Sequence, residues 1–344
     1  MSDDDRKSLG FLAEAYQKLC AEMGKVIVGQ ETVIEQLMIG LFARGHCLLV
    51  GVPGLAKTLM IRTLASCLSL RFNRIQFTPD LMPSDITGTE VIQEDKATGV
   101  RELRFLPGPI FANLVLADEI NRTPPKTQAA LLEAMQEYQV TVGGKRHPLE
   151  PPFYVLATQN PIEQEGTYPL PEAQLDRFMM NIQIDYPTED EEMDIVLRTT
   201  SDISMTVESV LTGEDVLKLQ RVVRRIAVPE HVARYAVKIT RWSRPQVPDG
   251  PKFVKDYVTW GGGPRATQCL VLAAKARAAL HARPAIDIED IRAVVLPVLR
   301  HRIILSFNAV AEGLKPDDII CRLLDSIGNP EDALIARGIL RKLS

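Results

Sequence analysis

The sequence predicts an α/β domain built on a doubly wound parallel sheet, followed by a smaller all-helical domain. A short apolar run at 46–50 is followed by a glycine-containing turn and then by a helix, which is the order of a βα unit. From Gly213 onward, apolar residues recur almost entirely at helical spacing. We therefore expect one domain over residues 1–204 and a second over 205–344.

The first elements are two amphipathic helices between Phe11 and Phe42, separated by the segment VIVGQ. Five apolar runs bounded by turn residues predict the strands of the sheet, at 46–50, 71–77, 114–118, 153–158 and 181–184. Two hairpins interrupt the βα repeat as insertions. One turns around 96–100, and the other turns at the glycine pair 143–144.

A capping box formed by Thr188 and Glu191 predicts the start of a helix after the last strand. We read its acidic first turn as a solvated helix start rather than as a metal or partner site. The helices of the second domain are expected at 214–227, 230–243, 265–282, 288–300 and 316–326.

The formal net charge of −4 excludes a uniformly basic, nucleic-acid-coating protein. The charge is nevertheless divided, because residues 1–204 carry 18 basic and 29 acidic side chains and residues 205–344 carry 22 and 15. The five cysteines show no CxxC pair, and no apolar run is long enough to span a membrane. The start of the chain is acidic, unlike a signal peptide. We expect a soluble, cytoplasmic protein.

The segment GVPGLAKT, from Gly51 to Thr58, matches the phosphate-loop pattern G-x-x-x-x-G-K-[ST] except at Ala56. Successive backbone N–H groups and the helix N-terminus can bind an anion, Lys57 can reach the β- and γ-phosphates, and the Thr58 hydroxyl can ligate Mg²⁺. The alternative is a tight turn with an incidental lysine. The candidate nucleotide-binding residues are Gly51, Val52, Pro53, Gly54, Leu55, Ala56, Lys57, Thr58 and Leu59.

Asp118 and Glu119 end the apolar strand in LVLADEIN, where strand ends of open α/β sheets meet ligands. Asp118 would hold Mg²⁺, directly or through water, and Glu119 would act as general base toward an attacking water. A DE pair after a strand can also be a simple strand end in solvent. Because it follows a phosphate loop, we favour the catalytic interpretation.

Three further residues are candidates for contact with the nucleotide. Asn160 follows the next strand, and its amide could orient a water if that strand lies beside the one ending in Asp118. Arg177 lies between a short helix and a strand, and Arg265 lies at a helix start, where a cation opposes the helix dipole. Structural salt bridges are the alternative for both arginines.

The segments VIVGQ, GVPGLAKT, LVLADEIN, ATQNP, LPEAQLDRF and GGPRAT together resemble the MoxR family of AAA+ ATPases, over roughly residues 20–325. The resemblance implies an ATPase core with an insertion at its second helix, a hairpin before the sensor strand, and a helical lid. The lid motif departs slightly from the family pattern because it reads GGGPRAT. The final stretch NPEDALIARGILRKLS extends past the family's usual end.

The resemblance also implies roles for individual residues. Lys57 and Thr58 would be the Walker A pair, and Asp118 and Glu119 the Walker B pair. It makes Asn160 sensor 1, Arg177 the arginine finger and Arg265 sensor 2, and it places Val28 and Gly29 against the adenine. Gln76 would restrain Glu119 when no substrate is engaged.

The function that the resemblance implies is an ATP- and Mg²⁺-dependent chaperone, which remodels or matures protein complexes or inserts metal cofactors into them. Its expected state is a homo-oligomer that forms a hexameric ring, and its partners would be a protein client and a von Willebrand factor A domain protein. One alternative is a nucleic-acid motor that uses Lys145, Arg146 and His147 at a hairpin tip. Another is a nucleotide-sensing scaffold with little turnover, against which Glu119 argues.

Overall fold

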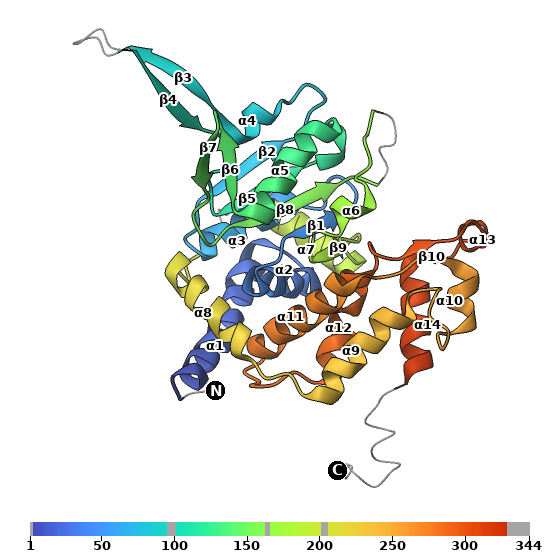
Figure 1. Cartoon of the computed structure of the whole chain (residues 1–344). Coiled ribbons are helices and arrows are strands. Elements are labelled where there is room, and N and C mark those ends of the chain that lie inside the picture. The colour runs from blue at the N-terminus through green and yellow to red at the C-terminus, as the bar shows by residue number, and fades with distance from the viewer. Residues whose placement is uncertain (1–2, 95–100, 162–165, 201–205, 329–344) are drawn as a thin grey trace.

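Five parallel strands form the central sheet in the spatial order β2–β5–β8–β1–β9 (Figure 1). The computed structural model describes residues 3–94, 101–161, 166–200 and 206–328. The strand order confirms the predicted doubly wound sheet, and all five carboxyl ends meet at one edge. The strands are β1 (Cys47–Val50), β2 (Phe72–Gln76), β5 (Leu114–Asp118), β8 (Tyr154–Gln159) and β9 (Met180–Gln183).

Both faces of the sheet are buried, so each strand sends alternate side chains into two different cores. Leu48 belongs to one hydrophobic cluster and Leu49 to the other, and Val115 and Leu116 divide in the same way. Helix α5 (Pro125–Glu137) packs on the first face. The opposite face is covered by α1 (Asp3–Val26), α2 (Glu31–Ala43) and α3 (Lys57–Cys67).

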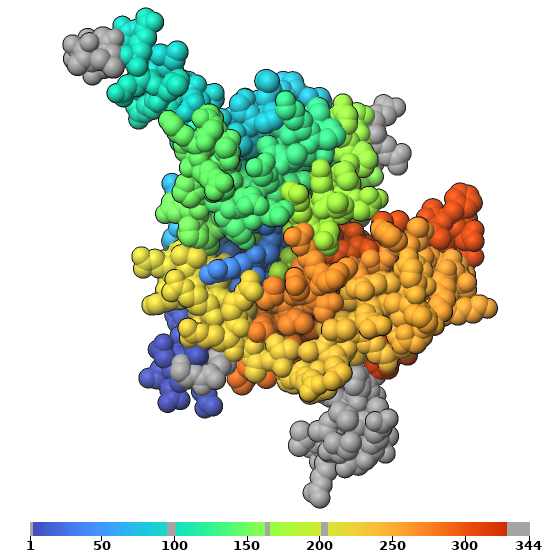
Figure 2. Space-filling view, viewed as in Figure 1, coloured from blue at the N-terminus to red at the C-terminus, as the bar shows by residue number. Residues whose placement is uncertain are grey.

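Two antiparallel hairpins interrupt the βα repeat, as predicted. The longer one follows the short helix α4 (Pro83–Thr87) and projects away from the body of the molecule (Figure 2). Ile92 and Leu103 lie opposite each other on it and are 69% and 62% exposed. The four strands are β3 (Gly88–Glu94), β4 (Arg101–Pro107), β6 (Gln139–Val142) and β7 (Lys145–Pro148).

A predominantly helical lid follows the sheet. Helix α7 (Glu189–Thr199) starts at the predicted capping box, in which the Thr188 backbone N–H donates to Glu191 at 2.7 Å. Within the lid, α11 packs against α9 and α12, and it also contacts α1 and α2. The longer lid helices are α8 (Gly213–Arg225), α9 (Glu230–Trp242), α11 (Pro264–Leu280), α12 (Ile288–Leu299) and α14 (Pro316–Ile327).

Some short elements were not predicted. Two short lid strands pair in antiparallel fashion. They were not predicted because each is too short to show a period-two pattern and its partner is distant in sequence. Helix α1 begins at Asp3 rather than near Phe11, and its first turn holds three aspartates that the helix dipole favours. The remaining elements are η1 (Ile120–Arg122), α6 (Glu172–Leu175), α10 (Lys252–Tyr257), β10 (Val258–Trp260), β11 (Ile304–Leu305) and α13 (Phe307–Ala311).

Three predictions fall outside the described residues. They are the domain boundary at 204/205, the hairpin turn at 96–100 and the C-terminal extension 329–344. The boundary therefore stays a prediction. The structure does show that one hydrophobic cluster runs without interruption from the helices α1, α2 and α3 into the lid helices.

Candidate functional site

The loop 51–56 connects β1 to α3. Its two glycines suit the backbone conformation, whereas Ala56 adopts a conformation that is unfavourable for an alanine. Gly54 has a φ of 89°, which glycine adopts freely. A Cβ on Gly51 would approach the Ile184 carbonyl oxygen at 2.7 Å, so this position needs glycine. Ala56 is the N-cap of α3 with a φ of 52°, a left-handed conformation that costs an L-residue ~1 kcal/mol or more. The loop thus directs the backbone N–H groups at the start of α3 toward one space.

Lys57 lies at the first position of α3 and is half-buried. Its ammonium donates a hydrogen bond to the Gly51 carbonyl oxygen, within the loop itself. Burial lowers the pKa of Lys57, and the nearby carboxylates of Asp118 and Glu119 partly oppose that shift. The lysine is therefore held over the loop. A bound anion would stabilise its ammonium charge and offset the cost of its burial.

Asp118 ends β5 and is 9% exposed. One carboxylate oxygen accepts a hydrogen bond from the Thr158 hydroxyl at 2.6 Å. The other accepts from Arg74 Nε at 2.9 Å and from its Nη2 at 2.6 Å. Because β5 lies between β2 and β8, the Asp118 carboxylate accepts hydrogen bonds from a residue of each neighbouring strand.

Glu119 follows directly in a left-handed conformation, with a φ of 57°. Its backbone N–H donates to the Thr158 hydroxyl at 2.8 Å. Its carboxylate accepts from Gln76 Nε2 at 2.8 Å and from Arg122 Nη1 at 2.9 Å, both at the same oxygen. The contact between Gln76 and Glu119 is the one that the family resemblance implies.

These groups surround one cavity of about 420 Å³. Asn160 is 6% exposed and reaches this cavity because β8 lies beside β5, the condition stated for its role. Thr58 and Asp118 both line the cavity, and a hydroxyl and a carboxylate suit Mg²⁺ when phosphate and water oxygens complete its shell. The lining residues are Pro53, Gly54, Leu55, Ala56, Lys57, Thr58, Leu59, Asp118, Glu119, Thr158 and Asn160.

A second, mostly apolar cavity shares Gly54, Leu55, Ala56 and Leu59 with the first. Val28 lines it, together with Pro187 and Ile195 from the segment that leads into and forms α7. Gly29 directly follows Val28 with a φ of 65°. An apolar recess beside a phosphate loop fits a nucleobase, and Val28 lines it as the resemblance implies. Gly29 is not among the residues that line this recess.

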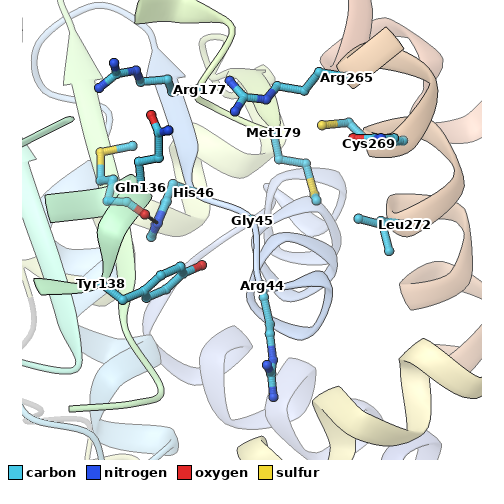
Figure 3. A pocket seen from close by; sticks show the side chains of 12 residues that line it. Arg44, Gly45, His46, Gln136, Tyr138, Arg177, Met179, Arg265, Cys269 and Leu272 are labelled. Atoms are coloured by element: carbon cyan, nitrogen blue, oxygen red, sulfur yellow. Dashed lines mark hydrogen bonds between the residues drawn. The ribbon is translucent and has the colours of Figure 1, made fainter. Parts of the chain in front are cut away.

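Arg177 and Arg265 line neither of these cavities. They line a third, between the core and the lid, and Figure 3 shows both side chains at the same end of it. Arg265 Nη1 lies 3.6 Å from Asp176 Oδ2. The Arg177 side chain has no hydrogen-bond or ion-pair partner within the described part of the chain. The structure thus places the two arginines at a different cavity from the phosphate loop of the same chain.

The hairpin residues of the nucleic-acid alternative are partly engaged elsewhere. Lys145 Nζ lies 3.8 Å from Glu90 Oε1 on the neighbouring hairpin. The His147 ring stacks on Phe105, with ring centroids 3.8 Å apart. These contacts connect the two hairpins and reduce the basic surface available to phosphates.

Sequence reasoning missed Thr158, Arg74 and Arg122. Thr158 and Arg74 act across strands, and the strand order needed to place them was not available from the sequence. Arg122 lies three residues after Glu119 in the same turn, a spacing that could have identified it. No group of three or more His, Cys, Asp or Glu residues suited to a metal ion occurs in the described ranges.

Comparison with known proteins agrees with this geometry. Residues 46–180 match the ATPase family associated with various cellular activities (AAA), and residues 252–323 match the AAA lid domain. The chain is 41% identical to Chaperone MoxR1 of Mycobacterium tuberculosis, over 94% of this chain and 85% of that protein. It is 33% identical to Protein MoxR of Methylorubrum extorquens, over 83% of this chain and 86% of the relative.

The chain belongs to the MoxR family of AAA+ ATPases. Among solved structures, a candidate ATPase from Cytophaga hutchinsonii is 42% identical to this MoxR-family chain. It superposes with a TM-score of 0.85, over 93% of this chain and 96% of that one. Within the described residues, no helix of this MoxR-family protein is both long enough and apolar enough to cross a membrane.

Proposed function

We propose that this MoxR-family protein binds ATP with Mg²⁺ in the cavity beneath the phosphate loop and hydrolyses it. The observation that carries the proposal is the convergence of Lys57, Thr58, Asp118, Glu119 and Asn160 on one cavity. An apolar recess for the base opens beside it. A binding-only scaffold would need no carboxylate at the position of Glu119.

Each group has a role that its surroundings support. The loop N–H groups and Lys57 bind the phosphates. Thr58 and Asp118 would hold Mg²⁺, which supplies charge neutralisation at the phosphate oxygens. Both oxygens of Asp118 already accept hydrogen bonds, which favours contact through a water molecule. Glu119 accepts the proton of the attacking water, and Asn160 orients that water.

Arg177 and Arg265 would complete the site of a neighbouring subunit. Both share one surface away from their own phosphate loop, and an arginine that approaches a transferring phosphoryl group accelerates turnover by roughly 10³–10⁵. Because the contributing and receiving surfaces differ, the contact is heterologous and closes into a ring when the rotation permits. We propose a hexamer.

We further propose that hydrolysis moves the lid against the core and drives remodelling, maturation or metal-cofactor insertion of a protein client. The exposed apolar pair Ile92 and Leu103 on the projecting hairpin supports a protein rather than a nucleic-acid client. A protein with a von Willebrand factor A domain would be the partner. The name of the mycobacterial relative, a chaperone, agrees with this reading.

Subunit mixing tests the proposal. We expect Glu119→Gln to bind ATP without turning it over, and Arg177→Ala to bind ATP and lose turnover by about 10³-fold. Mixing the two variants should restore activity, because Arg177→Ala subunits keep Glu119 and receive the arginine of a Glu119→Gln neighbour. Phosphate release is the measurement. Full turnover by Arg177→Ala alone, or by Glu119→Gln alone, would refute the assigned roles.

A further inference from the structure

The turn 300–302, which follows α12 in the lid, contacts the core segment 176–181. Arg300 Nη1 donates to the Asn181 carbonyl oxygen at 3.1 Å, and a ring nitrogen of His301 lies 3.1 Å from the Phe178 carbonyl oxygen. Arg302 makes the largest number of these contacts. Three consecutive lid residues thus hold the backbone on both sides of Arg177.

Arg302 is a buried arginine whose side chain is 2% exposed. Its Nε donates to Asp176 Oδ1 at 2.7 Å, and its Nη2 donates to the Asp176 and Phe178 carbonyl oxygens at 3.1 and 2.7 Å. Its Nη1 donates to the Met179 carbonyl oxygen at 3.1 Å and also to that of Val298. All five guanidinium N–H groups are thereby used.

Asp176 joins this contact to Arg265. One of its carboxylate oxygens accepts from Arg302, and the other faces Arg265 Nη1 at 3.6 Å. Asp176 directly precedes Arg177 in the chain. One carboxylate therefore fixes the start of the segment that carries Arg177 and also restrains the side chain of Arg265.

A buried ion pair rarely adds net stability compared with apolar residues of similar size, because desolvation offsets the attraction. Its effect here is geometric. The planar fork of Arg302 binds three carbonyl oxygens of the chain from 176 to 179, which fixes the path of this segment, while the Arg177 side chain remains without a partner in the described ranges. Lysine cannot reproduce this pattern, since it has three donors and no fork.

We propose that Arg302 and Asp176 are positioning residues for Arg177 and Arg265, so that the docking of the lid on the core sets the pair of arginines offered to the neighbouring subunit. The inference rests on the proposed function, in which these arginines act on the neighbour's nucleotide. A lid displacement would move 300–302 and hence Arg177. The position of the lid in one subunit would then determine the rate of ATP hydrolysis in the neighbouring subunit.

Asp176→Asn tests the proposal with little change of shape, and Arg302→Lys tests it from the other side. We expect turnover to fall about ten- to a hundredfold, as for a misplaced catalytic group, while ATP affinity in the subunit's own cavity stays unchanged. Glu230→Gln is the control. It weakens the exposed Arg234–Glu230 ion pair of 2.5 Å on the lid helix α9, without touching the turn 300–302, Asp176 or Arg265, and should leave turnover close to that of the unmodified protein.

Mixing provides the readout that a merely structural role would not give. Asp176→Asn subunits keep Glu119, so Glu119→Gln neighbours with ordered arginines should restore their turnover. Normal turnover by both Asp176→Asn and Arg302→Lys, or a loss that mixing does not restore, would overturn the inference. These outcomes are separate from failure of the proposed function, which Arg177→Ala reports independently.

Discussion

At the scale of single residues, the site shows two carboxylates that are held before any nucleotide is present. Glu119 accepts hydrogen bonds from Gln76 and Arg122 at one oxygen, at 2.8 and 2.9 Å. A carboxylate held in this way faces Gln76 and Arg122 rather than a water beside the phosphate. We propose that release of Glu119 from these contacts is part of activation.

Gln76→Ala removes one of these restraints. We expect turnover without a client to rise by about two- to tenfold, the equivalent of one hydrogen bond's net free energy. Steady-state phosphate release at saturating ATP measures it. Gln93→Ala is the control, because Gln93 accepts from Arg104 at 3.0 Å on the exposed hairpin. Unchanged or lower turnover of Gln76→Ala would show that Gln76 does not restrain Glu119.

The sequence identified the residues whose signal is local. Lys57, Asp118 and Asn160 each follow an apolar strand in a recognisable motif, so the cavity that they share could be anticipated. Thr158 and Arg74 could not be anticipated, because their contacts with Asp118 depend on which strands are adjacent. The position of Arg177 relative to its own phosphate loop likewise depends on tertiary packing.

At the scale of elements, the strands of the sheet were predictable, whereas the side-chain hydrogen bonds that connect the strands with one another and with the covering helices were not. All five strands were placed within two residues of their ends, since each is an apolar run between turn residues. These connections depend on single polar side chains. His46, just before β1, accepts from the Val155 N–H of β8 at 3.0 Å and donates to the Met135 carbonyl oxygen of α5 at 3.1 Å.

The buried position of His46 predicts that folding stability depends on pH. Burial lowers the pKa of His46 from 6.5 to about 4, and the hydrogen bond to Met135 opposes this only in part. Between these values the unfolded chain binds a proton that the folded protein excludes, so folding stability falls as pH falls from 6.5 toward 4. The loss between pH 7.5 and pH 5 should be about 2 kcal/mol for His46. Burial lowers the pKa of His301 as well, which adds to the fall.

Urea unfolding of His46→Gln at the two pH values checks the assignment. The variant should show a smaller loss of stability on acidification than the unmodified protein. His231→Gln replaces an exposed histidine on α9 and should retain the full loss. An identical pH dependence in His46→Gln would refute the contribution of His46.

At the scale of the whole molecule, charge is distributed unevenly along the chain. Residues 1–204 carry an excess of acidic side chains and residues 205–344 an excess of basic ones. In the proposed ring, the basic lid of one subunit would lie against the acidic core of the next. This division of charge would provide an electrostatic contribution to assembly that a uniform charge would not provide.

Salt should therefore weaken the ring. The Debye length falls from ~8 Å at 0.15 M ionic strength to ~3 Å at 1 M, which screens the attraction between subunits. We expect ATP-bound Glu119→Gln to dissociate toward smaller species over this range, as measured by sedimentation velocity. Sucrose at matched osmolality is the control. Assembly that does not respond to salt would assign the charge division to client contacts instead.

The hydrophobic cluster that passes without interruption from α1, α2 and α3 into the lid also bears on how such a protein can be divided. A lid bounded by sequence alone, cut near 205, would leave its partner helices α1 and α2 behind with a bare apolar face. The same cluster also contains sheet residues such as Leu49 and Leu116, so α1 and α2 cannot be transferred with the lid without uncovering one face of the sheet. Neither the lid nor the core is therefore a module that can be exchanged alone.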